Sequence, residues 1–174
     1  EIQITQDLVQ KKSITPNDAG CLQYIEDFLT QRGFINETLT FGRVKNLWSV
    51  KRNNGPLLVF LGHVDVVPTG PENEWEHDPF SGYDDGTFIN GRGTGDMKGG
   101  IACFMSALSR IDVDSLNYSI GFLITADEEG PSKDGTVKVV EELLQRNEKI
   151  DYCLIGEPST LELSLIHISE PTRR

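Results

Sequence analysis

The sequence contains no run of apolar residues that approaches the length of a membrane span, and it carries no secretory signal. It has only three cysteines in 174 residues, and they are far apart, with no Cys-x-x-Cys pair. These absences argue against a membrane protein, a disulfide-rich secreted domain and a thiolate zinc site. We therefore expect a cytoplasmic protein whose cysteines are reduced and buried.

Positive charge is also scarce, because 16 lysines and arginines stand against 27 acidic residues and leave a net charge of −11. Such a surface repels the phosphates of nucleic acids and the head groups of anionic membranes, so neither is expected as a partner. The length suits one domain with a real core and is too short for two. Since residue 1 is Glu, we expect an incomplete N-terminus.

Apolar periodicity predicts strands that alternate with helices. Helices are expected over residues 4–12, from Thr15-Pro16 to Gly33, over 101–111 and over 134–146, and strands within 38–52, 57–61, 118–125 and 152–155. The run 57–61 is short, apolar and bordered by turn residues, which is typical of a strand buried inside a sheet. The alternation indicates an α/β fold: a mixed, mostly parallel twisted sheet flanked by helices.

Several finer expectations concern packing. The helix over 101–111 is apolar almost all round, which predicts that Cys103 and Met105 lie in the core. The helix over 134–146 is expected to pack through one face formed by Val137, Val140 and Leu144.

Turn and loop signals add three further expectations. Thr15 is expected to cap the second helix, with Pro16 at its first position. Asp85-Gly86 predicts a tight hairpin. The loop over 68–82 contains Trp75 and Phe80, so we expect it to pack back on the body.

Ionisable residues lie just beyond three of the predicted strands. His63 and Asp65 come after the first, Asp127-Glu128-Glu129 after the second, and Glu157 after the third. Each stretch alone fits a solvated turn, but open α/β sheets place their sites at the carboxyl ends of strands. If the backbone is extended, Glu128 and Glu129 face opposite ways, so that one can bind a metal while the other handles a proton.

A fourth acid, Asp96, lies in a glycine-rich stretch over residues 91–100. The glycine spacing fits neither a dinucleotide-binding turn nor a phosphate loop, because Asp96 replaces the third glycine and no Gly-Lys-Ser/Thr follows. An acid on such a turn suits a cation better than a phosphate. One imidazole with several carboxylates favours zinc, manganese or cobalt, and a bridging carboxylate makes a two-metal site plausible.

Four stretches together carry a family resemblance: residues 62–68 (GHVDVVP), 91–100 (GRGTGDMKGG), 127–130 (DEEG) and 156–158 (GEP). They resemble the M20 metallopeptidase and deacylase family, in the same order and spacing, and the likeness spans roughly residues 4–160. The resemblance implies part of a zinc-exopeptidase-like catalytic domain. It also implies an amide hydrolase with two Zn²⁺ ions, for which Co²⁺ or Mn²⁺ are possible substitutes.

The resemblance also implies a role for each site residue. One zinc would be bound by His63 and Glu157, the other by Glu129, and both by Asp96. Asp65 would orient His63, and Glu128 would be the general base that takes a proton from water. The Asp96-Met97 peptide is expected to be cis.

The expected substrate is a small N-acyl amino acid, and the full-length protein is expected to be a homodimer. Residues 1–160 correspond to a partial catalytic domain, without the family's lid and dimerisation domain and without a later histidine ligand. Residues 161–174 are expected to be an atypical, foreign tail, in which His167 does not replace that ligand. We expect weak or no activity from this chain alone. The alternatives are another deacylase of the family, of the acetylornithine or aminoacylase type, and a non-catalytic metal-binding fragment.

Overall fold

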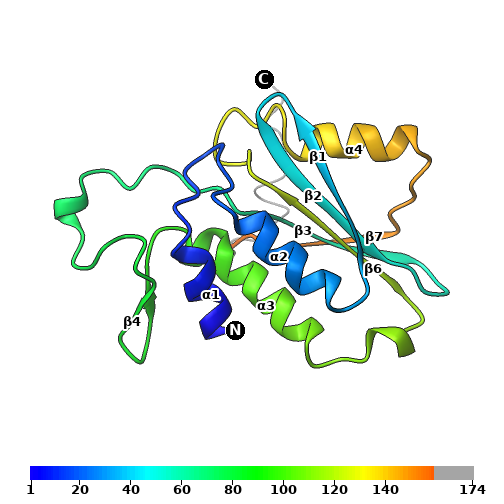
Figure 1. The fold of residues 1–174 in the computed structure, drawn as a ribbon, viewed down its shortest axis with the longest axis horizontal. Helices are drawn as coiled ribbons and strands as arrows, with labels where there is room; N and C mark the ends of the chain where they lie inside the picture. The colour runs from blue at the N-terminus through cyan, green and yellow to red at the C-terminus, as the bar shows by residue number, and fades with distance from the viewer. Residues whose placement is uncertain (159–174) are drawn as a thin grey trace, which may run out of the picture.

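A computed structural model describes residues 1–158 of the chain, so the tail over 161–174 and its His167 lie outside the described residues. Its main sheet has five strands in the order β1-β2-β6-β3-β7 (Figure 1). The strands are β1 (Ile35–Phe41), β2 (Val44–Lys51), β3 (Leu57–His63), β6 (Ser119–Thr125) and β7 (Tyr152–Ile155). Strands β6, β3 and β7 run parallel, whereas β2 is antiparallel to both β6 and β1. The prediction of a mixed, mostly parallel sheet is therefore confirmed.

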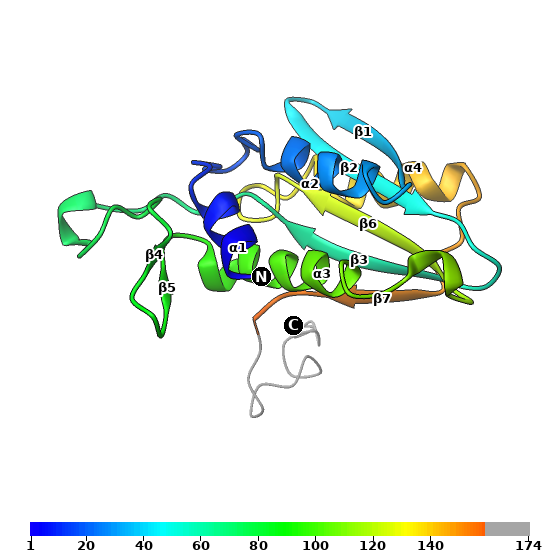
Figure 2. The same cartoon turned by 60° about the horizontal axis from the view of Figure 1, so that its bottom comes forward.

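Helices cover both faces of this sheet (Figures 1 and 2). The helices are α1 (Ile2–Val9), α2 (Cys21–Thr30), α3 (Gly99–Leu108) and α4 (Thr136–Gln145). The first three share one apolar cluster with the sheet, and α4 shares another with the opposite face. Short turns of helix lie at η1 (Glu72–Glu74), η2 (Thr94–Lys98) and η3 (Val113–Ser115).

The alternation of side chains along β3 joins the two clusters. Leu58 and Phe60 contribute to the α3 side, and Leu57 and Val59 to the α4 side. Phe60 stacks on Phe104 of α3, with ring centroids 4.5 Å apart. Strand β3 is thus paired on both sides and covered on both faces, although the middle strand is β6, whose seven residues are all buried.

The predicted start of the second helix is wrong. Helix α2 begins at Cys21, because Thr15 is held by the sheet end instead: its N–H donates to the carbonyl of Val66 (3.0 Å), and Ile14 forms a bridge with Val66. The Thr15-Pro16 peptide is cis. The side chain of Asp18 accepts the N–H of Gly20 just before the helix begins.

The predicted inner face of α4 is also wrong. Val139 and Leu143 are buried, whereas the predicted residues are exposed, to 57% at Val137, 37% at Val140 and 67% at Leu144. The helix start explains the rotation. A Cβ on Gly135 would meet the backbone oxygen of Asp127 at 2.6 Å, so Gly135 is pressed against the end of β6. Positions 139 and 143 follow Gly135 at intervals of four residues and therefore face inward.

The burial of two of the three cysteines differs from the expectation that all three are buried. Cys21 is buried, but Cys103 and Cys153 are exposed. Helix α3 buries Ile101, Ala102, Met105 and Leu108, so the expected core position is confirmed for Met105 and wrong for Cys103. The interior of strand β2 is almost wholly buried.

The segment between β3 and η2 projects from the body (Figures 1 and 2). It packs back only in part: Phe80 is buried and Trp75 half-buried, whereas Glu72–Glu74 is exposed. The predicted hairpin is present as β4 (Tyr83–Asp84) and β5 (Ile89–Asn90). Among the described residues, no helix has both the length and the apolar character needed to cross a membrane.

One close backbone approach fixes α3 against the end of β7. A Cβ on Gly100 would lie 2.6 Å from the carbonyl oxygen of Gly156, whereas a Cβ on Gly95 would meet nothing within 4 Å. We predict that Gly100→Ala lowers the free energy of unfolding by about 1–3 kcal/mol through overpacking. The matched control Gly95→Ala should change it by less than about 0.5 kcal/mol. Urea unfolding followed by circular dichroism measures both, and equal effects would contradict the close approach.

Candidate metal centre

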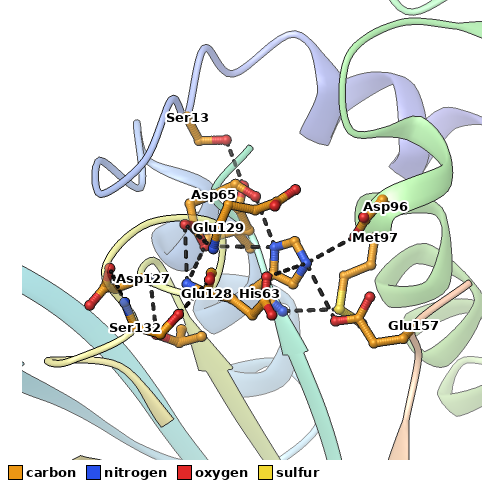
Figure 3. Close-up of polar contacts among 12 residues, drawn as sticks. Ser13, His63, Asp65, Asp96, Met97, Asp127, Glu128, Glu129, Ser132 and Glu157 are labelled. Carbon is orange, nitrogen blue, oxygen red and sulfur yellow. Dashed lines mark hydrogen bonds and ion pairs between the residues drawn. The ribbon is translucent and has the colours of Figure 1, made fainter. Parts of the chain in front are cut away.

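Three separate segments bring acidic side chains to an imidazole carried by a fourth (Figure 3). His63 lies at the end of β3, Asp96 in η2, Glu128 after β6 and Glu157 after β7. The Nε2 atom of His63 is 3.0 Å from Asp96 Oδ1, 3.5 Å from Glu157 Oε1 and 3.7 Å from Glu128 Oε2. The structure therefore brings together side chains that are separated by up to 94 positions in the sequence.

The other ring nitrogen of His63 is fixed by the backbone. Nδ1 lies 2.8 Å from the carbonyl oxygen of Asp65. A carbonyl oxygen only accepts, so Nδ1 must carry the proton and donate it. Nε2 is then the atom available to a metal ion, on the side where the carboxylates converge. The imidazole is 1% exposed, so its orientation is held by packing as well.

The carboxylate of Asp65 has a different position from that expected. It lies 3.6 Å from His63 Nδ1, beyond hydrogen-bond distance. It accepts instead the backbone N–H of Glu128 at 3.2 Å and that of Glu129 at 3.1 Å, and it is completely buried. Asp65 thus orients the imidazole through its carbonyl and the two glutamates through its side chain.

A second buried aspartate organises the loop that follows. The carboxylate of Asp127 accepts the backbone N–H groups of Ser132, Lys133 and Asp134, at 3.2, 3.0 and 3.0 Å. The hydroxyl of Ser132 donates to the carbonyl of Glu128 at 2.5 Å. The three adjacent acids therefore have different positions. Asp127 hydrogen-bonds the loop that follows, whereas Glu128 and Glu129 face the imidazole.

The turn that carries Asp96 packs against β3. The Asp96-Met97 peptide is cis, as the family resemblance implied. Met97 is buried, and its sulfur accepts the backbone N–H of His63 at 3.2 Å. Gly62 leaves room for it, since a Cβ there would lie 2.7 Å from Met97 Cε. Met97, the residue after Asp96, thus fixes the position of Asp96 by packing directly on the carboxyl end of β3.

Two residues that support the site were missed by sequence reasoning. The hydroxyl of Ser13 donates to the carbonyl of Val64, between His63 and Asp65, at 2.6 Å. The ammonium of Lys98 donates to the carbonyls of Leu8 and Lys11 and is fully buried. No sequence signal identifies Ser13. For Lys98 the only signal is a lysine within a glycine-rich stretch ahead of an apolar helix.

The convergence of acids perturbs their protonation. Burial first, and then the charges of Asp96 and Glu128, raise the pKa of Glu157 to about 7 against the opposing effect of His63. Burial and the charge of Asp96 also raise the pKa of Glu129.

The imidazole responds in the opposite sense to burial. Burial alone would lower the pKa of His63, but the carbonyl of Asp65 and the surrounding carboxylates raise it above its ordinary value. The site without metal therefore retains protons near neutral pH.

The donor set fits metal ions. Two groups of possible ligands share the imidazole: His63 with Glu128 and Glu157, and His63 with Asp96 and Glu129. Within each group the ligand atoms lie within 4.8 Å of one another. One nitrogen and several carboxylate oxygens match the ligands that Zn²⁺, Mn²⁺ and Co²⁺ take in proteins. Distances alone do not separate Glu128 from the ligands.

Comparison with known proteins agrees with this chemistry. A profile of Peptidase family M20/M25/M40 matches residues 59–169. The chain is 52% identical over 161 residues to succinyl-diaminopimelate desuccinylase from Marinobacter nauticus. It is 54% identical over 162 residues to the protein of the same name from Hydrogenovibrio crunogenus. Each alignment covers 91% of this chain and 43% of the relative, so the chain spans less than half the length of these curated relatives.

Solved structures share the fold at lower identity. Human carnosine dipeptidase 1 matches with a TM-score of 0.81 and 20% identity, over 92% of this chain and 38% of that protein. An M20 family metallo-carboxypeptidase from Sulfolobus solfataricus matches with a TM-score of 0.78 and 22% identity, over 89% and 36%. The prediction of an M20-type catalytic domain fold, present in part, is confirmed.

Protons retained in the centre predict a pH-dependent metal affinity. The pKa of Glu157 is raised to about 7 and that of His63 is raised above its ordinary value, so both groups gain protons as the pH falls, and a metal ion must displace them. We predict that Zn²⁺ affinity falls as the pH drops from 8 to 6, by about tenfold per pH unit for each proton displaced. Competition with a chromophoric chelator measures this slope. Glu157→Gln has no proton to lose there and should give a shallower slope, so an unchanged slope would contradict the assignment.

Proposed function

Because the chain belongs to peptidase family M20/M25/M40, we propose that it is the metal-binding part of a dizinc amide hydrolase. The reaction is hydrolysis of N-succinyl-LL-2,6-diaminopimelate to succinate and LL-2,6-diaminopimelate. The observation that carries the proposal is the buried imidazole of His63, which meets carboxylates from three other segments at 3.0–3.7 Å. Such a constellation suits metal-assisted hydrolysis.

The choice of substrate is supported by the relatives. Two curated relatives above 50% identity carry the name succinyl-diaminopimelate desuccinylase. The sequence itself also resembles that enzyme within the family, most closely over residues 122–159. Since the chain spans 43% of these relatives, recognition of the substrate is expected to involve residues beyond those described here.

Membership of the family implies metal ions, and the residues present fit two of them. We assign His63 and Glu157 to one Zn²⁺, Glu129 to the other, and Asp96 to both. Asp96 can serve both because it is the carboxylate nearest to His63 Nε2 and also belongs to the group that contains Glu129. When bound, the ions polarise the acyl carbonyl and lower the pKa of water, and Co²⁺ or Mn²⁺ are possible substitutes.

Glu128 is the residue best placed to move the proton. Of the three carboxylates around His63 Nε2 it is the farthest, at 3.7 Å, and its side chain is 51% exposed. In the reaction it takes a proton from the attacking water as the C–O bond forms. It then delivers this proton to the amide nitrogen as the C–N bond breaks, so that the amine leaves neutral.

The buried aspartates keep Glu128 in this position. Asp65 holds the backbone N–H of Glu128, and Ser132 holds its carbonyl. The glutamate is therefore anchored by its main chain while its side chain remains free to rotate between water and leaving group. This arrangement suits a group that must accept a proton at one point and release it at another.

A chimera tests the proposal. Residues 1–158 of this chain are joined to the remaining part of the Marinobacter nauticus desuccinylase, and the purified protein is loaded with Zn²⁺. We predict hydrolysis of N-succinyl-LL-2,6-diaminopimelate, and a loss of kcat of about 10²–10⁴-fold in Glu128→Gln, with Zn²⁺ affinity unchanged. Release of succinate is the assay, and Zn²⁺ affinity is measured on the same preparations.

The control variant is Glu141→Gln, an exposed glutamate of α4 whose partner is Lys138. It should keep full activity. Loss of metal affinity in Glu128→Gln would make Glu128 a ligand instead of a base. Faster hydrolysis of N-acetylornithine than of the succinyl substrate would favour the acetylornithine type of deacylase. A chimera that binds Zn²⁺ and hydrolyses neither substrate would favour a non-catalytic fragment.

A further inference from the structure

Lys98 is the largest of the side chains that are fully buried in the described structure. Burial of an ammonium is unfavourable unless hydrogen bonds satisfy it. Here Nζ donates to the carbonyl of Leu8 at 2.9 Å and to that of Lys11 at 3.0 Å. Leu8 lies in the last turn of α1 and Lys11 lies two residues beyond the end of the helix, a region where the helix dipole favours a cation.

The backbone of Lys98 closes the turn that presents Asp96. Its N–H donates to the carbonyl of Gly93 at 2.9 Å. Gly93 has φ +82°, and a Cβ there would lie 2.4 Å from Val66 and 3.4 Å from the Lys98 stem. Lys98 therefore packs beneath the turn, two residues from Asp96, and anchors it to α1.

The same N-terminal segment also holds the other ligand segment. The Ser13 hydroxyl donates to Val64 O at 2.6 Å, and the N–H of Val66 donates to Ser13 O at 2.9 Å. Residues 8–15 thus bond to the chain on both sides of Asp65 and, through Lys98, to the turn of Asp96. Both connections therefore link the N-terminal segment to the parts of the chain that carry His63 and Asp96.

We propose that Lys98 is a positioning residue of the metal centre, which sets the place of Asp96 relative to His63 by tying the Asp96 turn to the carboxyl end of α1. The proposal rests on the proposed function, because it assigns a role toward the metal ions. Lys98 contacts neither ion and acts through the turn. No described acidic side chain forms an ion pair with it, so its bonds are to the backbone alone.

The test compares Zn²⁺ affinity with stability in the 174-residue chain. Lys98→Met keeps the length and apolar stem of the side chain but removes the ammonium. We expect Zn²⁺ affinity to fall at least tenfold, and the visible absorption bands of the Co²⁺-loaded variant to shift because the ligand geometry changes. Thermal unfolding of the metal-free proteins is recorded alongside.

Two controls separate positioning from charge and from stability. Lys12→Met removes the same charge from an exposed side chain on the same segment. Val139→Ala removes buried contacts beneath α4, in the cluster on the opposite face of the sheet. Both should keep the wild-type Zn²⁺ affinity and Co²⁺ spectrum, whereas Val139→Ala alone of the two should lower the unfolding temperature.

The outcomes are distinct. A wild-type Zn²⁺ affinity and Co²⁺ spectrum in Lys98→Met would overturn the proposal. A decrease in Zn²⁺ affinity no larger than the decrease measured for Val139→Ala would overturn it too. If Lys98→Met does not fold, Lys98→Gln, which removes the charge but retains an NH₂ donor group, carries the comparison. Unfolding of both variants that saturating Zn²⁺ does not reverse would assign Lys98 to folding alone and overturn the proposal. Failure of the unmodified chain to bind Zn²⁺ would contradict the proposed function, and this inference with it.

Discussion

Repulsion between like charges is the constraint on which this structure depends. Two unit charges 4 Å apart repel by about 4 kcal/mol at an effective dielectric constant of 20. The fold nevertheless places several carboxylates around one imidazole, and burial, together with the charges of Asp96 and Glu128, raises the pKa of Glu157 to about 7. Protons relieve the repulsion in the absence of metal, and dications relieve it more completely. The free energy that the fold spends in gathering these acids is therefore recovered when cations bind, which couples metal binding to the stability of the site.

Not every acid at this end of the sheet serves the imidazole. Asp65 and Asp127 are buried and use their carboxylates on backbone N–H groups, which fixes the loop that carries Glu128 and Glu129. The two aspartates therefore fix the loop, while the side chains of Glu128 and Glu129, which are more exposed, remain available for ions and protons.

The pattern of strands followed by acids could be predicted from the sequence because parallel strands share one edge, so that His63, Glu128 and Glu157 had to meet if the sheet formed. Which face of a helix is buried was harder to predict. In α4 apolar residues occur on two faces, and only the contact of Gly135 with the end of β6 decides that Val139 points inward. Likewise Thr15 has a good capping signal, yet its backbone pairs with Val66. In both places a tertiary contact overrides a local preference.

The support of the metal centre was invisible in the sequence for a related reason. Ser13 and Lys98 donate hydrogen bonds to backbone carbonyls. Every residue type has a backbone carbonyl, so the sequence does not indicate which carbonyls accept such bonds. Side-chain pairs such as His63 and Asp96 can be inferred from matching chemistry, whereas these bonds depend only on where the main chain passes. The N-terminal segment thus acquires its role from geometry: it passes beside the turn of Asp96, where the buried ammonium of Lys98 donates to the carbonyls of Leu8 and Lys11.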